Sequence, residues 1–142
     1  MELQERALTY KILAAAIEVH KILGPGLLES VYQNCLSVEF ENVGLKYSRE
    51  RAINFEYKNR KIDSGFRIDF LIEERVVLEI KSVETILPVH ESQLLTYLRL
   101  SDKTVGLLVN FNVTILKNGI RRRVLFPKEG GTENDPLPWE DV

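Results

Sequence analysis

The sequence has a single cysteine, Cys35, among its 142 residues. One cysteine cannot form an internal disulfide and cannot supply a structural zinc cluster, so neither explains the stability of the fold. Long apolar runs are missing too, since the longest falls far short of the roughly 20 residues that a membrane span needs. The opening residues, MELQER, contain no apolar signal core. We therefore expect a reduced, cytoplasmic setting and no membrane association.

An excess of charge of either sign is also lacking. The 19 basic and 21 acidic residues give a formal net charge of −2, so any basic surface that binds nucleic acid must be local. The length and the 44% hydrophobic content suit one domain. Composition changes at residue 127, where glycine, proline and acidic residues become dominant. We expect a domain over residues 1–126 and a loose, acidic tail over residues 127–142, with Trp139 either at a poorly ordered terminus or docked on another surface.

Apolar residues recur at helical spacing in two N-terminal segments. They predict helices over about residues 4–23 and 27–42, separated by Gly24-Pro25-Gly26. A third helix is expected over about residues 89–100, after Pro88.

Alternating or continuous apolar residues predict the strands. We expect strands over residues 53–57, 62–72, 76–81 and 104–109, with weaker ones at 113–116 and 124–126. Turns are expected at Asn59-Arg60 and Asn118-Gly119, and a bulge at Ser64-Gly65. The order α-α-β-β-β-α-β predicts an α/β fold in which helices flank a mixed β-sheet.

Burial determines the register of the hairpin formed by residues 66–72 and 76–81. Opposite residues in a hairpin point to the same face, so even positions must pair with even positions, as a three-residue loop allows. Asp69 then lies opposite Glu79, and Arg67 opposite Lys81. The apolar side chains at even positions are expected to be buried together on the other face: Phe66, Ile68, Phe70, Ile72, Val76, Leu78 and Ile80.

This register gathers two carboxylates and an ammonium group on one face of the sheet. Opposite side chains have Cβ atoms about 4.5–5.5 Å apart, and two carboxylates at that spacing repel each other unless a cation lies between them. A charged strand face is usually a solvated face with ion pairs. Here the strand over residues 76–81 is apolar on both sides of its charges, so we favour a functional site.

The same residues resemble known motifs. Asp69 followed by Glu79-Ile80-Lys81 resembles the D…(D/E)-x-K signature of the PD-(D/E)XK nuclease superfamily. Gln93 and Tyr97 resemble the Q-x-x-x-Y motif of its RecB and lambda-exonuclease branch. Residues 26–32, GLLESVY, are similar to the motif that names the GxxExxY family. The resemblance covers about residues 2–111.

The resemblance implies a restriction-endonuclease-like fold and a metal-dependent nuclease that hydrolyses phosphodiester bonds of DNA or RNA. Asp69 and Glu79 would be metal ligands, together with the backbone carbonyl of Ile80, and Glu29 would complete or orient the metal shell. Lys81 would orient the attacking water or stabilise the developing charge on the phosphate. Oxygen ligands of this kind favour Mg²⁺ or Mn²⁺.

Four further residues are candidates for binding the substrate. Gln93 and Tyr97 share a helix face and would brace the site or contact the substrate backbone. Arg67 could contact a phosphate or pair with Glu79. His90 could reach the same cleft or only begin its helix. Tyr32 lies on an apolar stripe and is expected in the core.

Other functions stay open at this point. A degenerate nuclease fold could bind nucleic acid or a protein without cutting, and the acidic net charge and small size favour that reading. A regulatory component that docks through Trp139 is a third alternative. The intact Asp69, Glu79 and Lys81 favour the nuclease. The run Arg121-Arg122-Arg123 is expected to be a solvated edge rather than a phosphate site. A homo-oligomer or a protein partner is compatible with the sequence.

Overall fold

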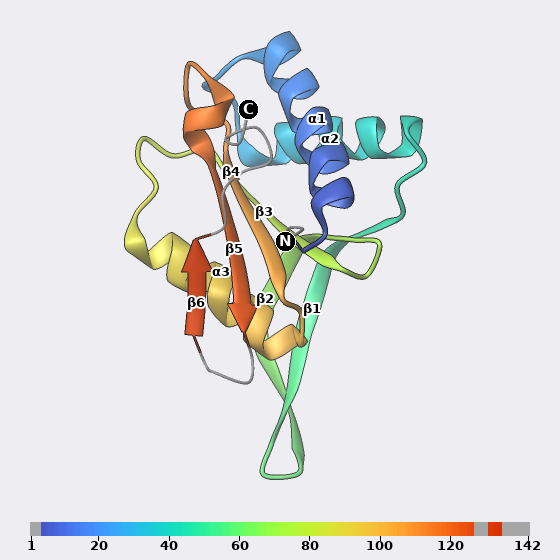
Figure 1. Ribbon diagram of the computed structural model, residues 1–142, viewed down its shortest axis with the longest axis vertical. Helices are drawn as coiled ribbons and strands as arrows, with labels where there is room; N and C mark the ends of the chain where they lie inside the picture. Colours follow the sequence, from blue (N-terminus) through green and yellow to red (C-terminus); the bar gives the residue numbers. More distant parts are fainter. Residues whose placement is uncertain (1–3, 127–130, 135–142) are drawn as a thin grey trace.

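The computed structural model describes residues 4–126 and 131–134 (Figure 1). The helices are α1 (Arg6–Leu23), α2 (Glu29–Asn42), α3 (Pro88–Ser101) and the short 3₁₀ helix η1 (Leu116–Gly119). The strands are β1 (Tyr47–Tyr57), β2 (Arg60–Ile72), β3 (Val76–Lys81), β4 (Val105–Asn110), β5 (Ile120–Phe126) and β6 (Gly131–Asn134). This order confirms the predicted α/β class with the α-α-β-β-β-α-β succession.

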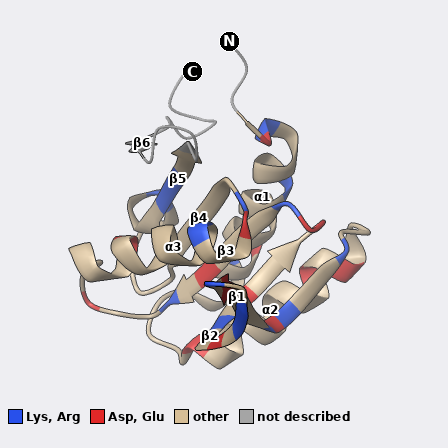
Figure 2. Cartoon of the chain, turned by 90° about the horizontal axis from the view of Figure 1, so that it is seen from below, with Lys and Arg blue, Asp and Glu red and all other residues tan. Residues whose placement is uncertain are grey.

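The strands form one mixed sheet in the order β1-β2-β3-β4-β5-β6. Only β3 and β4 are parallel, and every other neighbouring pair is antiparallel. Helix α3 makes the crossover between β3 and β4, as a parallel pair requires. Acidic and basic residues occur on several elements of the described chain, as Figure 2 shows.

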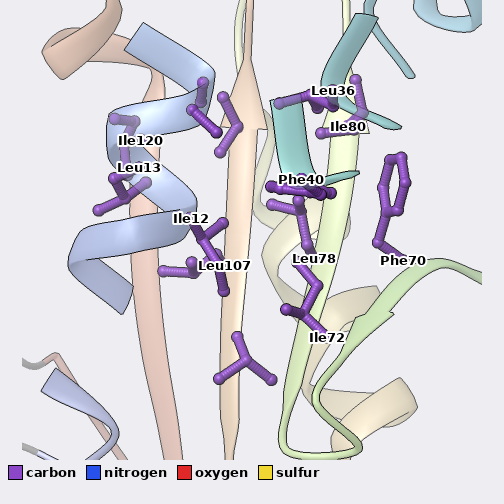
Figure 3. Packing of buried hydrophobic residues seen from close by; sticks show 14 of the residues in the cluster. Ile12, Leu13, Leu36, Phe40, Phe70, Ile72, Leu78, Ile80, Leu107 and Ile120 are labelled. Atoms are coloured by element: carbon purple, nitrogen blue, oxygen red, sulfur yellow. The ribbon is translucent and has the colours of Figure 1, made fainter. Parts of the chain in front are cut away.

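Helices cover both faces of the sheet. On one face α1 and α2 pack on the strands and form a cluster that we call the α1/α2 core, which includes Ile12, Phe40, Leu78 and Leu107 (Figure 3). On the other face α3 forms a smaller cluster, the α3 core, with Leu94 and Leu98 at its centre. Because both faces are covered, all six residues of β4 are buried. Each buried aliphatic side chain contributes about 1.5–3 kcal/mol to folding.

The β1–β2 hairpin differs from the sequence prediction in its length and its turn. Strand β1 starts at Tyr47, and Tyr57 pairs with Arg60, so the turn residues are Lys58 and Asn59 rather than Asn59-Arg60. Both turn residues have positive φ, 48° and 66°, which is the geometry that matches the twist of a two-residue hairpin. The predicted bulge is confirmed, since the register shifts after Ala52 and Gly65 has a φ of 79°.

The weak strand expected at residues 113–116 is absent from the described structure. The carbonyl oxygen of Val113 lies 2.7 Å from Nε2 of His20 on α1. Leu116 is buried in the α1/α2 core and begins η1. The apolar residues of this segment therefore make tertiary contacts with the helices instead of pairing in the sheet.

The segment predicted as a tail contains β6, which pairs with β5 through residues 131–134. The rest of that segment, including Trp139, lies outside the described residues, so the division at residue 127 stays a prediction. No helix in the described part of the chain is long and apolar enough to cross a membrane.

Candidate active site

The predicted register of β2 and β3 is confirmed. Ile72 pairs with Val76, and Phe70 pairs with Leu78, around a turn of three residues. The backbone ladder ends at Phe70 and Leu78. One further step in the same register sets Asp69 opposite Glu79, at the point where the two strands separate.

Two reciprocal hydrogen bonds replace the ladder at this point. The backbone N–H of Asp69 donates to Oε2 of Glu79, and the backbone N–H of Ile80 donates to Oδ2 of Asp69, each at 2.8 Å. Each carboxylate therefore binds the main chain of the opposite strand. The two side chains hold the separating strands together and are themselves fixed in place.

The alternation of faces along β2 breaks at Asp69. Phe70 packs in the α1/α2 core, whereas Ile68 packs with Leu71 in the α3 core. The expectation that Ile68 shares a face with Phe70 is therefore wrong. Glu50 stands between the β1 residues that pair with Phe70 and Ile68, and its φ of 51° is left-handed. A non-glycine residue is uncommon in that region, and Glu50 lies beside Asp69, where the alternation of faces changes.

Both carboxylates have a raised pKa. Glu79 is 5% exposed. Burial raises its pKa well above the ordinary value, and the charge of Asp69 raises it further. Burial also raises the pKa of Asp69, and the hydrogen bond from Ile80 opposes that effect. The ammonium group of Lys81 lowers the pKa of both. The single ammonium group of Lys81 therefore does not balance the negative charge of the Asp69 and Glu79 carboxylates.

Lys81 ends β3 beside this pair. Its side chain is half-buried and makes no ion pair within the described part of the chain. Its carbonyl oxygen accepts the N–H of Phe111 at 3.0 Å. The loop that follows is held by the buried Asn110, which accepts the N–H of Val83 at 3.0 Å and donates to its carbonyl at 2.9 Å.

Asn110 was not among the residues singled out from the sequence. The signal for it is a single polar residue at the end of the apolar run VGLLVN, on the strand that pairs in parallel with β3. That signal becomes meaningful only once β3 and β4 are known to be neighbours, because Asn110 then lies beside Lys81.

The residues of the G-x-x-E-x-x-Y segment begin with a loop next to β3, which hydrogen bonds hold in place and which we call the motif loop. The hydroxyl of Tyr32 donates to the carbonyl of Gly24 at 2.6 Å and accepts the N–H of Leu27 at 3.2 Å. The hydroxyl of Ser82 donates to the carbonyl of Leu27 at 2.6 Å. Tyr32 is fully buried and stacks on Phe111 with ring centroids 4.3 Å apart, which confirms its expected place in the core.

Glu29 is the first residue of α2, directly after this loop. Its charge raises the pKa of Asp69, as the last of several contributions, so the two carboxylates are electrostatically coupled. Among the described residues, however, no three histidine, cysteine or acidic side chains group together in a way that could hold a metal ion. The role of Glu29 in the metal shell stays a prediction.

Helix α3 brings Tyr97 close to the carboxylates. Tyr97 is 5% exposed, and its pKa is raised to about 12 by burial and by the charges of Glu79 and Asp69. Its hydroxyl therefore keeps its proton at neutral pH. Gln93 lies one turn earlier and is half-buried. Within the described residues, neither the Tyr97 hydroxyl nor the Gln93 amide forms a hydrogen bond, which leaves both available to a substrate. Leu94 and Leu98 are buried, as predicted.

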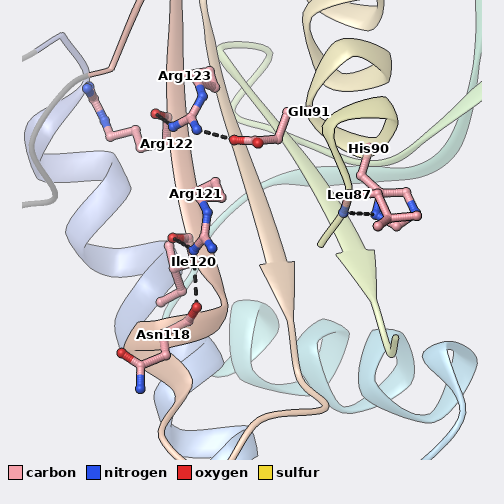
Figure 4. A network of polar contacts seen from close by, with 8 residues as sticks. All are labelled: Leu87, His90, Glu91, Asn118, Ile120, Arg121, Arg122 and Arg123. Carbon is pink, nitrogen blue, oxygen red and sulfur yellow. Dashed lines mark hydrogen bonds and ion pairs between the residues drawn. The ribbon is translucent and has the colours of Figure 1, made fainter. Parts of the chain in front are cut away.

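Two other substrate candidates lie at the margin of the site. Nδ1 of His90 accepts the N–H of Leu87 at 3.0 Å, so His90 caps the start of α3 (Figure 4). Arg67 is exposed and forms no ion pair with Glu79. Phe66, expected on the buried face, is 40% exposed, and its ring centroid lies 5.3 Å from that of Tyr97.

The arginine run on β5 is not the solvated edge that the sequence suggested. Arg122 is buried and donates to the carbonyl of Gln4. Arg123 pairs with Glu91 on α3, and Arg121 donates to the carbonyls of Asn118 in η1 and of Ile120 (Figure 4). Arg122 and Arg123 therefore connect β5 to other segments, whereas Arg121 binds the turn before its own strand.

A comparison with family models gives one match. The model of the PD-(D/E)XK nuclease superfamily matches residues 6–123, which run from α1 into β5. No curated protein and no solved structure matches the chain.

Proposed function

Because the chain belongs to the PD-(D/E)XK nuclease superfamily, we propose that it is a divalent-metal-dependent nuclease that hydrolyses phosphodiester bonds of nucleic acid. The observation that carries the proposal is the reciprocal pair of hydrogen bonds between Asp69 and Glu79 and the facing main chains. It fixes two carboxylates side by side, with Lys81 two residues further along the same strand.

The donor set fits a hard divalent cation. Glu79 is buried, Asp69 is half-buried, and both have a raised pKa, so a cation between the two carboxylates would stabilise them. The N–H of Ile80 points toward β2, and the carbonyl of a strand residue leaves the same edge as its N–H. Asp69, Glu79 and this carbonyl would hold the ion, and carboxylate and carbonyl oxygens suit Mg²⁺ or Mn²⁺. When bound, the ion would supply an activated water and neutralise charge on the phosphodiester.

The protein's own groups would complete the site. Lys81 carries the one ammonium group that lowers the pKa of both carboxylates, and we assign it to the attacked phosphate or to the water that attacks. The Tyr97 hydroxyl stays protonated because its pKa is raised to about 12, so it can donate to a phosphate oxygen. Gln93 offers an amide from the preceding turn. Arg67 is exposed and would contact the substrate further out, whereas His90 serves the helix start.

Within the superfamily, we assign the chain to the GxxExxY family and to the RecB and lambda-exonuclease branch. The contacts of Tyr32 and Ser82 support this, because they connect the motif loop to the residue after Lys81. In this arrangement Glu29 would orient or complete the metal shell. We also propose a cytoplasmic location, with which the free Cys35 is compatible.

A second candidate function is a non-catalytic module that binds nucleic acid or a protein. One observation favours it: the described residues contain no group of three ligating side chains that could hold a metal ion. Such a module would keep the fold and the carboxylate pair without turning over a substrate.

A cleavage assay separates the two candidates. The purified protein is incubated with labelled single- and double-stranded DNA and RNA in the presence of Mg²⁺, Mn²⁺ or EDTA. We expect cleavage with Mg²⁺ or Mn²⁺, none in EDTA, and none by Glu79→Gln. The matched control is Glu84→Gln, which removes an exposed carboxylate on the loop after β3 and should cleave like the wild type. Binding without cleavage in every metal would favour the second candidate.

A further inference from the structure

The outer part of the β1–β2 hairpin leaves the body of the protein as a two-stranded arm (Figure 1). We define the arm as residues 54–63, with Lys58 and Asn59 at its tip. No side chain of the arm is buried, and only Phe55 is half-buried. A free two-stranded ribbon has marginal stability in water and gains from a partner. Packing in the core of the protein therefore does not account for the presence of the arm.

The base of the arm is held firmly at the bulge in β2. The hydroxyl of Ser64 donates to the carbonyl of Ile53 at 2.8 Å and accepts the N–H of Phe66 at 3.0 Å. The carboxylate of Asp63 accepts the N–H of Gly65 at 2.8 Å. The first bond connects the two strands where the register shifts, and the other two fix the bulge within β2, so the arm leaves the sheet in a defined direction.

One face of the arm continues toward the active site. Tyr57 pairs with Arg60, and Phe55 pairs with Ile62, so these four side chains share a face. Ile53 precedes Phe55 by two residues on β1 and packs in the α3 core. Because the shift lies in β2, the face of Phe55 is the α3 side of the sheet. Tyr97, next to the carboxylates, lies on that side as well.

This face combines exposed apolar surface with the positive charge of Arg60, next to Lys58 at the tip. Tyr57 is 58% exposed and Ile62 is 39% exposed. Nζ of Lys58 lies 5.5 Å from the centroid of the Tyr57 ring. Three cations, Lys58, Arg60 and Lys61, fall within four residues, and none forms an ion pair within the described part of the chain. Lys61 lies on the other face, opposite Glu56, so the arm carries three cations against the two acids Glu56 and Asp63. Figure 2 shows the hairpin from below, with Lys and Arg segments beside its strands.

The reach of the arm spans about two thirds of a turn of duplex DNA. Along β1, which has no extra residues at the bulge, seven residues separate Tyr57, opposite Arg60, from Glu50, beside Asp69, which is roughly 23 Å at about 3.3 Å per residue. One turn of B-DNA is about 34 Å long. A two-stranded ribbon fits the major groove of B-DNA, which is about 12 Å wide, but not the deep and narrow major groove of A-form RNA.

We propose that the arm lies in the major groove of a double-stranded DNA substrate, about two thirds of a turn from the phosphate held at Asp69 and Glu79. The proposal rests on the proposed nuclease function and names its substrate class. Lys58, Arg60 and Lys61 contact phosphates on the two sides of the groove. The apolar face formed with Tyr57 contacts base edges.

Binding is tested with an arm variant, Lys58→Ser/Arg60→Ser/Lys61→Ser. The control, Lys11→Ser/Lys21→Ser/Lys117→Ser, removes the same charge from exposed positions on α1 and η1. Both are made in the Glu79→Gln protein, which is expected to bind without cutting. The affinity for a labelled 20-base-pair DNA is measured at several salt concentrations. We expect the arm variant to bind at least about tenfold more weakly and the slope of log affinity against log salt to fall by about 2–3. The control should change affinity by less than about twofold.

Duplex length and type give the second readout. A duplex of about 6 base pairs is too short to reach the tip, so the arm variant and its parent should bind it equally. Duplex RNA and single-stranded DNA should show no difference between them either. Equal weakening by the arm variant and the control, or a loss that is the same for every nucleic acid, would overturn the proposal. So would no measurable DNA binding by the parent, or a dimer that the arm substitutions dissociate.

The two experiments distinguish a failure of the arm proposal from a failure of the nuclease proposal. Arm-dependent DNA binding by a protein that cuts nothing in any metal would refute the nuclease and leave the arm. Metal-dependent cleavage of long duplexes that the arm substitutions do not change would refute the arm alone.

Discussion

Replacing Glu79 by glutamine should stabilise the metal-free protein while it abolishes cleavage. Glutamine has nearly the same shape, and its amide oxygen can still accept the N–H of Asp69 that the carboxylate now binds. The change removes one of two neighbouring negative charges in a buried place, where Glu79 is 5% exposed. Glu79, which is expected to hold a metal ion, therefore destabilises the folded protein when no ion is present.

The size of the effect follows from the register. Opposite side chains on paired strands have Cβ atoms about 5 Å apart, and two full charges at that distance repel by about 3 kcal/mol at an effective dielectric constant of about 20. Partial protonation and the ammonium group of Lys81 reduce this value, and the loss of a charge-assisted hydrogen bond offsets about 1 kcal/mol more. We expect a net gain of about 1–2 kcal/mol, or about 3–6 °C in melting temperature.

The dependence on pH has a defined sign. The folded-state pKa values of Asp69 and Glu79 are both raised, chiefly by burial. The wild type therefore has its full stability below the pKa of the unfolded carboxylates and loses stability as the pH rises through the folded-state values. Glu79→Gln and the wild type should melt at similar temperatures near pH 4, and the variant should melt higher near pH 8.

Thermal unfolding in EDTA and in Mg²⁺ or Mn²⁺ tests this reasoning. A bound ion stabilises the wild type by about 2.7 kcal/mol at a hundredfold excess over Kd, whereas the variant gains little, so their order should reverse. The control Glu84→Gln should follow the wild type in both buffers. If Glu79→Gln lowers the melting temperature in EDTA by the same amount at pH 4 and pH 8, charge repulsion is not what Glu79 contributes, and the reasoning is refuted.

Three further predictions concern the groups around the pair. Lys81→Ala should keep the metal-dependent rise in melting temperature and lose cleavage, and a loss of both would show that Lys81 serves the fold. Asn110→Ala removes three hydrogen bonds and should lower the free energy of unfolding by about 2–3 kcal/mol in urea and reduce cleavage. The control Asn112→Ala removes one long bond of 3.4 Å and should cost under about 1 kcal/mol. Tyr32→Phe should lower the free energy of unfolding by about 1–2 kcal/mol. A smaller loss would mean that water replaces the hydrogen bonds of the Tyr32 hydroxyl in the motif loop.

Much of the site could be predicted from the sequence because the alternation of apolar residues indicates the β2–β3 register. The structure buries both faces of β3, so it is this alternation, and not the exposure of one face, that points to the pairing. That pairing sets Asp69 opposite Glu79 without any knowledge of the chemistry. The buried Leu94 and Leu98 follow from helical spacing in the same way.

The twist at Asp69 could not be predicted from alternation. The rule that every second residue shares a face assumes a continuous strand, and the left-handed Glu50 breaks it for Ile68. No pattern in the sequence marks Glu50, since glutamate is not a residue that favours this conformation. The positions of Asn110 and Ser82 depend on which strands and loops become neighbours, which local patterns do not reveal.

The interrupted ladder also explains why this site contains carboxylates rather than amides. In a continuous antiparallel pair only one of the N–H groups of Asp69 and Ile80 would bind a backbone carbonyl of the opposite strand, because hydrogen-bonded and non-hydrogen-bonded pairs alternate. Here they bind Glu79 and Asp69 side chains, each at 2.8 Å, which leaves the remaining carboxylate oxygens and the carbonyl edge of Ile80 at one gap. Amides in both places could satisfy the same N–H groups and would keep the strands in position, but they would supply no negative charge to attract a cation. Under the proposed function the acidic pair therefore serves metal binding rather than the fold, and its replacement should separate activity from stability.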